Sequence, residues 1–259
     1  MSGLVTLELG RVAHLELVNP PLNLVTGELL EELAAALQTL AVAPPGDVRA
    51  VVLTGSGERS FSAGSHVGQF EAQRGPAGRV RFELEERVLR SLAELPMPTI
   101  AAIEGNALGG GLEIALCCDL RIASASAKLG LPEVRLAVTP GSGGTQRLPR
   151  IVGPARAKEL ILTGRVIDAD EAARIGLVTE VVPAGQARER AEAIAADIAM
   201  RGPIAVREAK ALIDGAWDLP IEAGIAAEIE ASERVFSSDD LLEGVASFFD
   251  KRDPEYTGH

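Results

Sequence analysis

The strongest constraint on the fold of this chain is a run of three glycines, Gly109 to Gly111, between two apolar segments. The residues before it, Pro98 to Ile103, predict a buried strand, and the residues after it, Leu112 to Leu116, predict a buried helix. Glycines at such a joint let the backbone approach a ligand closely. Because the first amides of a helix have no partner within it and lie at its positive end, this joint suits an anion or a developing oxyanion.

A second feature of this stretch is an acidic residue in an apolar setting. Glu113 lies two residues after the last glycine, on a segment with almost no other charge. A carboxylate in such a place is costly unless it is paired or used. These residues alone leave two interpretations open: a structural glycine turn with a salt-bridged glutamate, or a functional carboxylate beside an anion-binding corner.

The composition limits the classes of protein to consider. The chain has 259 residues, of which 47% are hydrophobic and 24% charged. This is enough for one large domain, or one domain with an appendage, and for a sizeable core. A net charge of −12 argues against nucleic acid or an anionic membrane as the main partner. No apolar run approaches the roughly 20 residues of a membrane span, and no signal-peptide pattern is visible, so we expect a cytoplasmic protein. The adjacent Cys117 and Cys118 are predicted to be reduced core residues.

The order of the predicted elements indicates an α/β core followed by helices. Strand and helix patterns alternate as far as Val182, whereas only helices are predicted beyond about residue 200. We therefore expect a core at residues 1–199 and a C-terminal helical region at residues 200–259. Within the core, the segment from Leu129 to Glu133 is predicted to be extended, and residues 69–78 to be a mobile polar loop before a charged helix.

Several familiar catalytic and binding motifs are absent from the sequence. The glycines from Gly141 to Gly144 lack the spacing of a dinucleotide-binding loop, and no phosphate-binding loop of the G-x-x-x-x-G-K-[ST] type occurs. No G-x-S-x-G elbow surrounds Ser65, which disfavours a serine hydrolase. The three histidines do not cluster with acidic residues at the spacing of metal ligands, so we expect no metal site.

What remains is a pair of carboxylates and a pair of glycine-rich corners. Glu133 follows Glu113 after one short predicted strand, so the chain could bring both to one end of a sheet. Two carboxylates in an apolar site can act on one water as base and acid. The loop from Phe61 to His66 follows a strand end and offers a second backbone amide. Two amides aimed at one carbonyl oxygen would stabilise an enolate.

Over nearly its whole length, from about Leu7 to Tyr256, the chain resembles the enoyl-CoA hydratase/isomerase, or crotonase, family. The resemblance rests on motifs in register along the chain: Gly105 to Ala115 with Cys118-Asp119, Phe61 to Ser65, Leu131 to Glu133, Pro140 to Leu148, and Glu243-Gly244 with Phe248 to Arg252. It implies an α/β fold, a crotonase-like spiral of ββα units. It also implies C-terminal helices that trimerise, commonly as a dimer of trimers.

The resemblance implies roles for single residues. The backbone amides of Ser65 and Gly110 would form an oxyanion hole for a thioester carbonyl. Glu113 and Glu133 match the family's two catalytic carboxylates, which in hydratases hold and activate the water and protonate the α-carbon. Gly141 would line the same pocket. The loop near residues 69–78 would shape the acyl part of the pocket, together with helix residues that the sequence does not place. No metal and no separate cofactor are implied, because coenzyme A enters as part of the substrate.

Coenzyme A would be held by the backbone and by a neighbouring subunit. The backbone around Leu22 and Ala63, with Gly64 beside it, would cradle the adenine and pantetheine. Phe248 and Lys251 match positions that reach the coenzyme A of a neighbouring subunit.

The chain departs from the family pattern at Ser65 and His66, where Ala and Asp are usual. The oxyanion hole should survive, because the backbone amide is unaffected by the first change. His66 either contacts the acyl group or coenzyme A, or is a neutral residue at the rim. Gly68 stands where a basic residue is common, so Arg59 or Lys251 is expected to bind phosphate instead.

Retention of both carboxylates favours an enoyl-CoA hydratase, a lyase that reversibly adds water to a trans-2-enoyl-CoA in the degradation of fatty acids or related acyl groups. The alternative is an enoyl-CoA isomerase that uses Glu133 as a one-base shuttle, or a hydrolase or decarboxylase of the same fold. A non-catalytic binder, for example of RNA, would need a basic face and is disfavoured by the net charge of −12.

Overall fold

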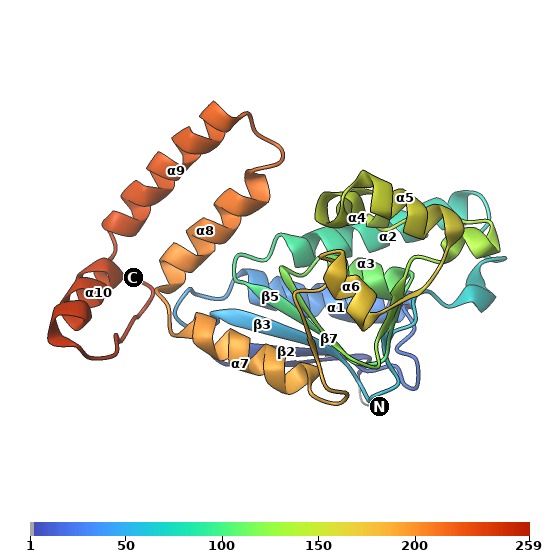
Figure 1. Ribbon diagram of the computed structural model, residues 1–259, viewed down its shortest axis with the longest axis horizontal. Coiled ribbons are helices and arrows are strands. Elements are labelled where there is room, and N and C mark those ends of the chain that lie inside the picture. The colour runs from blue at the N-terminus through green and yellow to red at the C-terminus, as the bar shows by residue number, and fades with distance from the viewer. Residues whose placement is uncertain (1–2) are drawn as a thin grey trace.

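The computed structural model describes residues 3–259 and contains two β-sheets with helices around them (Figure 1). The larger sheet has the spatial order β1 (Val5–Glu8), β2 (Val12–Leu17), β3 (Ala50–Gly55), β5 (Thr99–Ile103), β7 (Leu120–Ser124), β10 (Glu180–Val182). The smaller sheet has the order β4 (Ser60–Ser62), β6 (Asn106–Leu108), β8 (Lys128–Gly130), β9 (Ile167–Asp168).

The helices of the core alternate with the strands along the chain. They are α1 (Gly27–Ala41), α2 (Pro76–Ala93), α3 (Gly110–Leu116), α4 (Gly144–Val152), α5 (Pro154–Thr163), α6 (Ala169–Arg174), α7 (Ala187–Ala199) and the 3₁₀ helices η1 (Val67–Gln69) and η2 (Glu133–Leu136). Three further helices end the chain: α8 (Pro203–Gly215), α9 (Ile221–Phe236) and α10 (Asp239–Asp250).

The chain winds as a spiral that supplies both sheets in turn. Strands β3, β5 and β7 are parallel neighbours in the larger sheet, and the strands that follow them, β4, β6 and β8, are parallel neighbours in the smaller sheet. In the smaller sheet Ser60 pairs with Asn106, and Asn106 pairs with Lys128. The predicted spiral of ββα units is therefore confirmed. Because β4, β6 and β8 run side by side, the loops after them lie together.

The two faces of the larger sheet bury different helices. Val51 and Leu53 of β3 join the cluster that contains the buried leucines of α1, while Val52 of the same strand joins the cluster of α7. This period of two is what a parallel strand buried on both faces requires. Thr26 caps α1 by accepting a hydrogen bond from the Leu29 amide at 3.2 Å, as the sequence predicts. Cys117 and Cys118 are buried and free, also as predicted.

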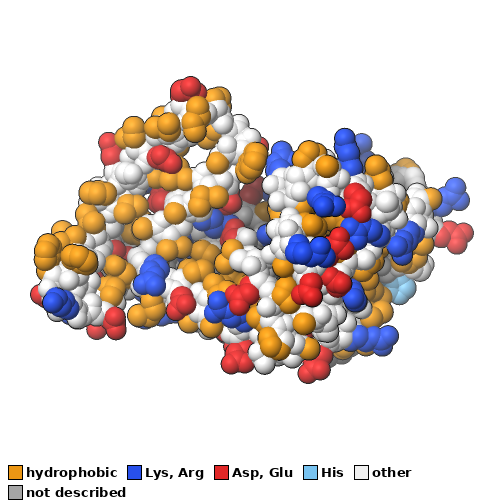
Figure 2. Space-filling view, viewed as in Figure 1, with side chains coloured by type: hydrophobic (Ala, Val, Ile, Leu, Met, Phe, Trp, Pro, Cys, Tyr) orange, Lys and Arg blue, Asp and Glu red, His pale blue; other side chains and the backbone are white. Residues whose placement is uncertain are grey.

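Helices α8 to α10 project from the core as an arm (Figure 1). Large apolar side chains are exposed along this arm, as the orange surface in Figure 2 shows. Those most exposed are Ile213, Trp217, Ile221, Ile225, Ile229, Phe236, Leu242, Phe248 and Phe249. Arg49 ties the end of the chain to the core, because its guanidinium donates to the carbonyls of Ala199 and Tyr256 at 2.9 and 2.6 Å. Among the helices of residues 3–259, none has both the length and the apolar character to cross a membrane.

Three local expectations differ from the structure. Ser60–Ser62 is a strand rather than part of a loop. Because it has three residues and one of them is apolar, it is too short to show the alternation of apolar and polar residues by which a strand is recognised in a sequence. Glu133 is the first residue of a 3₁₀ helix rather than the end of an extended segment. Helix α2 begins at Pro76, inside the segment predicted as a loop, since proline is well suited to the first turn of a helix.

Candidate active site

Two glycine-containing turns meet where β4 and β6 end. Gly64 has φ = 88° and Gly109 has φ = 53°, in the left-handed region that favours glycine. A Cβ at Gly64 would also lie only 2.6 Å from the Leu108 carbonyl oxygen, so a side chain cannot be accommodated there. Ser65 and Gly110 directly follow these glycines. The pairing of two neighbouring strands therefore brings together the two residues whose amides the sequence singles out.

The amides of Ser65 and Gly110 lie close to one another, and neither finds an acceptor in the described part of the chain. A Cβ built on Gly110 would point to the other turn, 3.6 Å from Ser65 Oγ and 3.8 Å from Ser65 N. Within residues 3–259, neither amide donates a hydrogen bond. Gly110 is also the first residue of α3, at the positive end of that helix. Two free amides in this arrangement can stabilise an oxygen that gains negative charge.

Glu113 is fixed at one end by backbone amides. It lies on α3 with 3% of its surface exposed, and its Oε1 accepts hydrogen bonds from the amides of Ser142 and Gly144, both at 2.8 Å. Gly144 opens α4, so the carboxylate also lies at the positive end of a second helix. No lysine or arginine of the described residues forms an ion pair with Glu113. Its carboxylate is therefore held by backbone amides, and not by the salt bridge expected if this were only a structural glycine turn. Burial raises the pKa of Glu113, and the two amides oppose this rise.

Glu133 lies in a contrasting environment. Both of its carboxylate oxygens are buried, and neither has a hydrogen-bond partner among residues 3–259. The side chain reaches toward the glycine turn, since a Cβ at Gly109 would be 3.2 Å from Glu133 Oε1. Burial, with a smaller contribution from the charge of Glu113, raises the pKa of Glu133 to about 7. An unpartnered carboxyl that titrates near neutral pH is well suited to exchange a proton with a ligand.

One cavity of about 410 Å³ joins these groups. It is lined by the two glutamates, by Ser65 and Gly110, and by Gly141, so the structure brings together five residues that the sequence analysis named. Ala63 and Gly64 line it as well. No cluster of three or more histidine, cysteine or acidic side chains suited to a metal ion occurs in the described part of the chain.

Two other parts of the chain complete the cavity wall. The turn after η1 contributes Phe70, Gln73 and Arg74, which lie in the loop of residues 69–78 that is expected to shape the acyl pocket. The sequence did not show which helix residues join it. Helix α2 contributes Arg81 and Glu85. Opposite charges four residues apart on a helix usually indicate an exposed pair, so the pattern gave no sign of burial.

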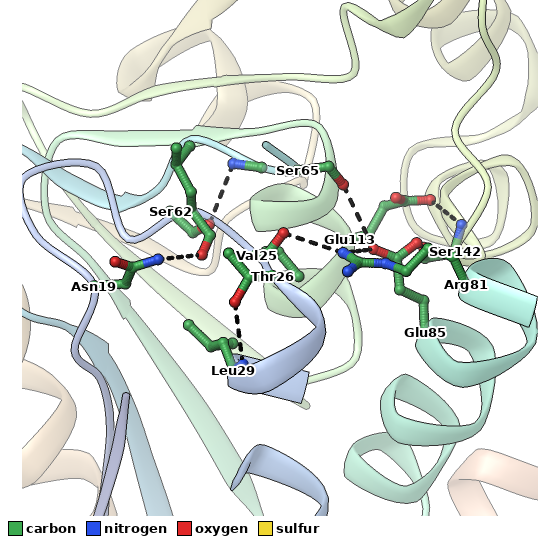
Figure 3. Close-up of polar contacts among 12 residues, drawn as sticks. Asn19, Val25, Thr26, Leu29, Ser62, Ser65, Arg81, Glu85, Glu113 and Ser142 are labelled. Carbon is green, nitrogen blue, oxygen red and sulfur yellow. Dashed lines mark hydrogen bonds and ion pairs between the residues drawn. The ribbon is translucent and has the colours of Figure 1, made fainter. Parts of the chain in front are cut away.

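Glu85 and Arg81 form a buried polar network beside Glu113 (Figure 3). Glu85 is 4% exposed and accepts hydrogen bonds from Arg81 Nη2 at 2.6 Å and from Ser142 Oγ at 2.8 Å. A longer contact of 3.5 Å joins its Oε1 to Ser65 Oγ. The same arginine nitrogen donates to the Val25 carbonyl at 3.1 Å. A third carboxylate is thus held within the wall of the cavity.

The residues expected to hold coenzyme A are placed in two groups. The Leu22 carbonyl accepts a hydrogen bond from the Ala63 amide at 2.9 Å, so the two backbone segments adjoin. His66 is exposed and is not among the residues that line the cavity. Phe248 is on α10 and Lys251 directly follows it, on the projecting arm, so within one chain they do not join the site (Figure 1).

A spiral of ββα units with this cavity at the ends of β4 and β6 defines a protein of the crotonase class. The chain belongs to the enoyl-CoA hydratase/isomerase family, whose model matches residues 8–259. This confirms the resemblance found in the sequence.

Named relatives and a solved structure agree with this membership. The chain is 41% identical over 244 residues to the short-chain-enoyl-CoA hydratase of Clostridium acetobutylicum, covering 94% of this chain and 93% of the relative. It is 40% identical over 237 residues to the crotonyl-CoA hydratase of Syntrophomonas wolfei, covering 91% and 90%. The crystal structure of enoyl-CoA hydratase from Bacillus anthracis superposes with a TM-score of 0.95 at 42% identity, covering 99% of this chain and 100% of that one.

Proposed function

We propose that this protein is an enoyl-CoA hydratase, which reversibly adds water to a trans-2-enoyl-CoA and yields the 3-hydroxyacyl-CoA. The observation that carries the proposal is one cavity lined by two glutamates in contrasting environments and by two amides that have no acceptor among residues 3–259. Relatives about 40% identical that are named as hydratases support it.

The amides of Ser65 and Gly110 stabilise the thioester oxygen in this proposal. Water adds to the β-carbon, and the electrons of the carbon–carbon double bond move through the α-carbon to that oxygen, giving an enolate. A carboxylate can activate the water only because the charge that develops on the oxygen meets two preorganised donors. One such donor is typically worth about 2.7–4 kcal/mol of the barrier.

The two glutamates divide the proton transfers. Glu113, held by two amides, takes a proton from the attacking water. Glu133, which has no hydrogen-bond partner among the described residues and a pKa of about 7, gives a proton to the α-carbon. One proton then returns from Glu113 to Glu133 to restore the starting state. Dehydration runs through the same steps in reverse. No cofactor is needed beyond the coenzyme A of the substrate.

We further propose that residues 200–259 form an oligomerisation region and that the protein is a homotrimer or a dimer of trimers. The apolar side chains exposed on α8 to α10 support this, because a monomer rarely exposes so continuous an apolar surface. Phe248 and Lys251 would then contact the coenzyme A of a neighbouring subunit. The segments of Leu22 and Ala63 would hold it from within the chain.

The first test is the ultraviolet absorbance of crotonyl-CoA after addition of the purified protein. Loss of the conjugated enoyl band, abolished in both Glu113→Gln and Glu133→Gln, is the expected result. Circular dichroism of each variant controls for folding. No change with crotonyl-CoA or with a longer enoyl-CoA would contradict the proposal. If Glu113→Gln still isomerised a 3-enoyl-CoA at the wild-type rate, an isomerase would be the better assignment.

A further inference from the structure

Glu85 is a buried charge that the proposed mechanism does not use. Its side chain lines the cavity, and both of its oxygens accept hydrogen bonds, from Arg81 and from the hydroxyl of Ser142. A buried ion pair adds little to stability, because removing two charges from water costs about as much as their attraction returns. The position of the pair at the edge of the site therefore calls for an explanation other than stability.

The partners of Glu85 belong to the segments that hold the catalytic groups. Ser142 donates its hydroxyl to Glu85 Oε2 and its backbone amide to Glu113 Oε1, so one residue joins the two carboxylates. Both bonds are 2.8 Å long. A displacement of Glu85 therefore moves a donor of Glu113 directly.

Arg81 connects the same network to the oxyanion turn. It donates to the Val25 carbonyl at 3.1 Å, and the Val25 amide donates to the Gly64 carbonyl at 2.9 Å, one residue before Ser65. The pair on α2 thus supports both halves of the site, although neither residue belongs to the glycine turns.

We propose that Glu85, held by Arg81, is a positioning residue that fixes the Ser142 loop against Glu113 and sets the charge that Glu113 experiences. The proposal rests on the proposed hydratase function for its kinetic part. Glu85 acts through Ser142 and through its field, since both of its oxygens are already engaged by protein donors.

The charged and titratable groups around Glu113 come from several elements. They are Glu85 on α2, Glu133 on η2, Arg147 on α4, and Cys117, which caps the C-terminal end of α3. The thiol stays neutral, because burial raises the pKa of Cys117. The charge of Glu85 adds to the raised pKa of Glu113, and that of Arg147 lowers it. Loss of the negative charge of Glu85 therefore favours ionised Glu113.

The test is Glu85→Gln, which keeps the shape of the side chain and an acceptor oxygen but removes the charge. The acid limb of the pH profile of hydration, where Glu113 takes its proton, is expected to move by about one unit to lower pH, since a nearby like charge shifts a pKa by this order. We expect kcat to fall about tenfold with KM nearly unchanged, because small misplacements of a catalytic group cost this much or more. A purely structural role of Glu85 would leave the pH profile in place.

A matched control comes from the same helix. Glu86 forms an exposed pair with Arg90 at 2.9 Å, four residues away like the buried pair, so Glu86→Gln should change neither the profile nor kcat. A second variant, Ser142→Ala, removes the hydroxyl that binds Glu85 but keeps the amide that binds Glu113. It should lower kcat with KM retained, and it keeps the proposal testable if Glu85→Gln fails to fold.

A measurement that needs no turnover separates this proposal from the hydratase assignment. The infrared band of protonated Glu113, identified by its loss in Glu113→Gln, is followed against pH in the free protein. Glu85→Gln should shift this titration to lower pH even if no enoyl-CoA is hydrated. A folded Glu85→Gln with unchanged infrared titration and unchanged kinetics would overturn the proposal, as would a Ser142→Ala variant with wild-type kcat.

Discussion

Gly110→Ala should abolish most of the activity while leaving the fold intact. The φ of Gly110 is outside the left-handed region, so alanine fits its backbone. The added Cβ would meet its nearest protein atoms at 3.6 and 3.8 Å, which are ordinary contacts. Alanine also has a higher helix propensity than glycine. The folded protein should therefore be as stable as the wild type, or slightly more stable.

The catalytic cost follows from where that carbon lies. An oxygen that accepts from both amides must be about 2.7–3.1 Å from each nitrogen. The new Cβ is bonded to the Cα of residue 110, next to the first of these nitrogens. It points toward the opposite turn and lies 3.8 Å from the second nitrogen, Ser65 N. The oxygen then loses at least one donor, which corresponds to a fall of about 10²–10³ in kcat, or about 2.7–4 kcal/mol.

The assay is hydration of crotonyl-CoA under steady-state conditions, together with thermal unfolding. Gly27→Ala is the matched control, because Gly27 is also the first residue of a helix and its added Cβ meets only Arg81 Nη1, at 3.9 Å. It should leave kcat within about twofold of the wild type. If Gly110→Ala also kept a kcat within that range, the two amides would not form the oxyanion hole and the reasoning would be refuted.

Four further predictions concern the protonation of Glu133, backbone strain and assembly. Folding raises the pKa of Glu133 from 4.5 to about 7. Between these two pH values the folded protein therefore binds a proton that the unfolded chain releases. The contribution of Glu133 to the free energy of unfolding should increase as pH falls from about 7 toward 4.5. For the same reason kcat/KM for hydration should fall as pH rises through about 7, and a flat profile there would argue against Glu133 as the acid. Gly64→Ala should lower the free energy of unfolding by more than about 1 kcal/mol in urea titrations, because φ is 88° and the new carbon would lie 2.6 Å from a carbonyl oxygen. Ile229→Glu, at a position 59% exposed on α9, should reduce the mass measured by light scattering, and an unchanged mass would argue against assembly through this face.

The sequence predicts those parts of the site that short-range patterns determine. The glycine run before Glu113 marks a strand-to-helix turn, and the structure has that turn at Gly109 and Gly110. The apolar spacing of α1 and the cap at Thr26 are equally local. The family motifs added the register of the whole chain, which no local pattern contains, and so placed Glu133 in the same cavity.

Long-range pairing sets the limit of that reasoning. Ser60–Ser62 is a strand because it pairs with β6, and this pairing brings Ser65 to Gly110. Glu85 and Arg81 have the spacing of an exposed helix pair, yet they are buried because the Ser142 loop and the Val25 carbonyl cover them. Glu86 and Arg90 have the same spacing and lie on the same helix, but their side chains are exposed. The difference between these two glutamate–arginine pairs, which have the same spacing but opposite order along the helix, therefore lies largely in segments some 60 residues away in sequence. It can be tested by comparing Glu85→Gln with Glu86→Gln.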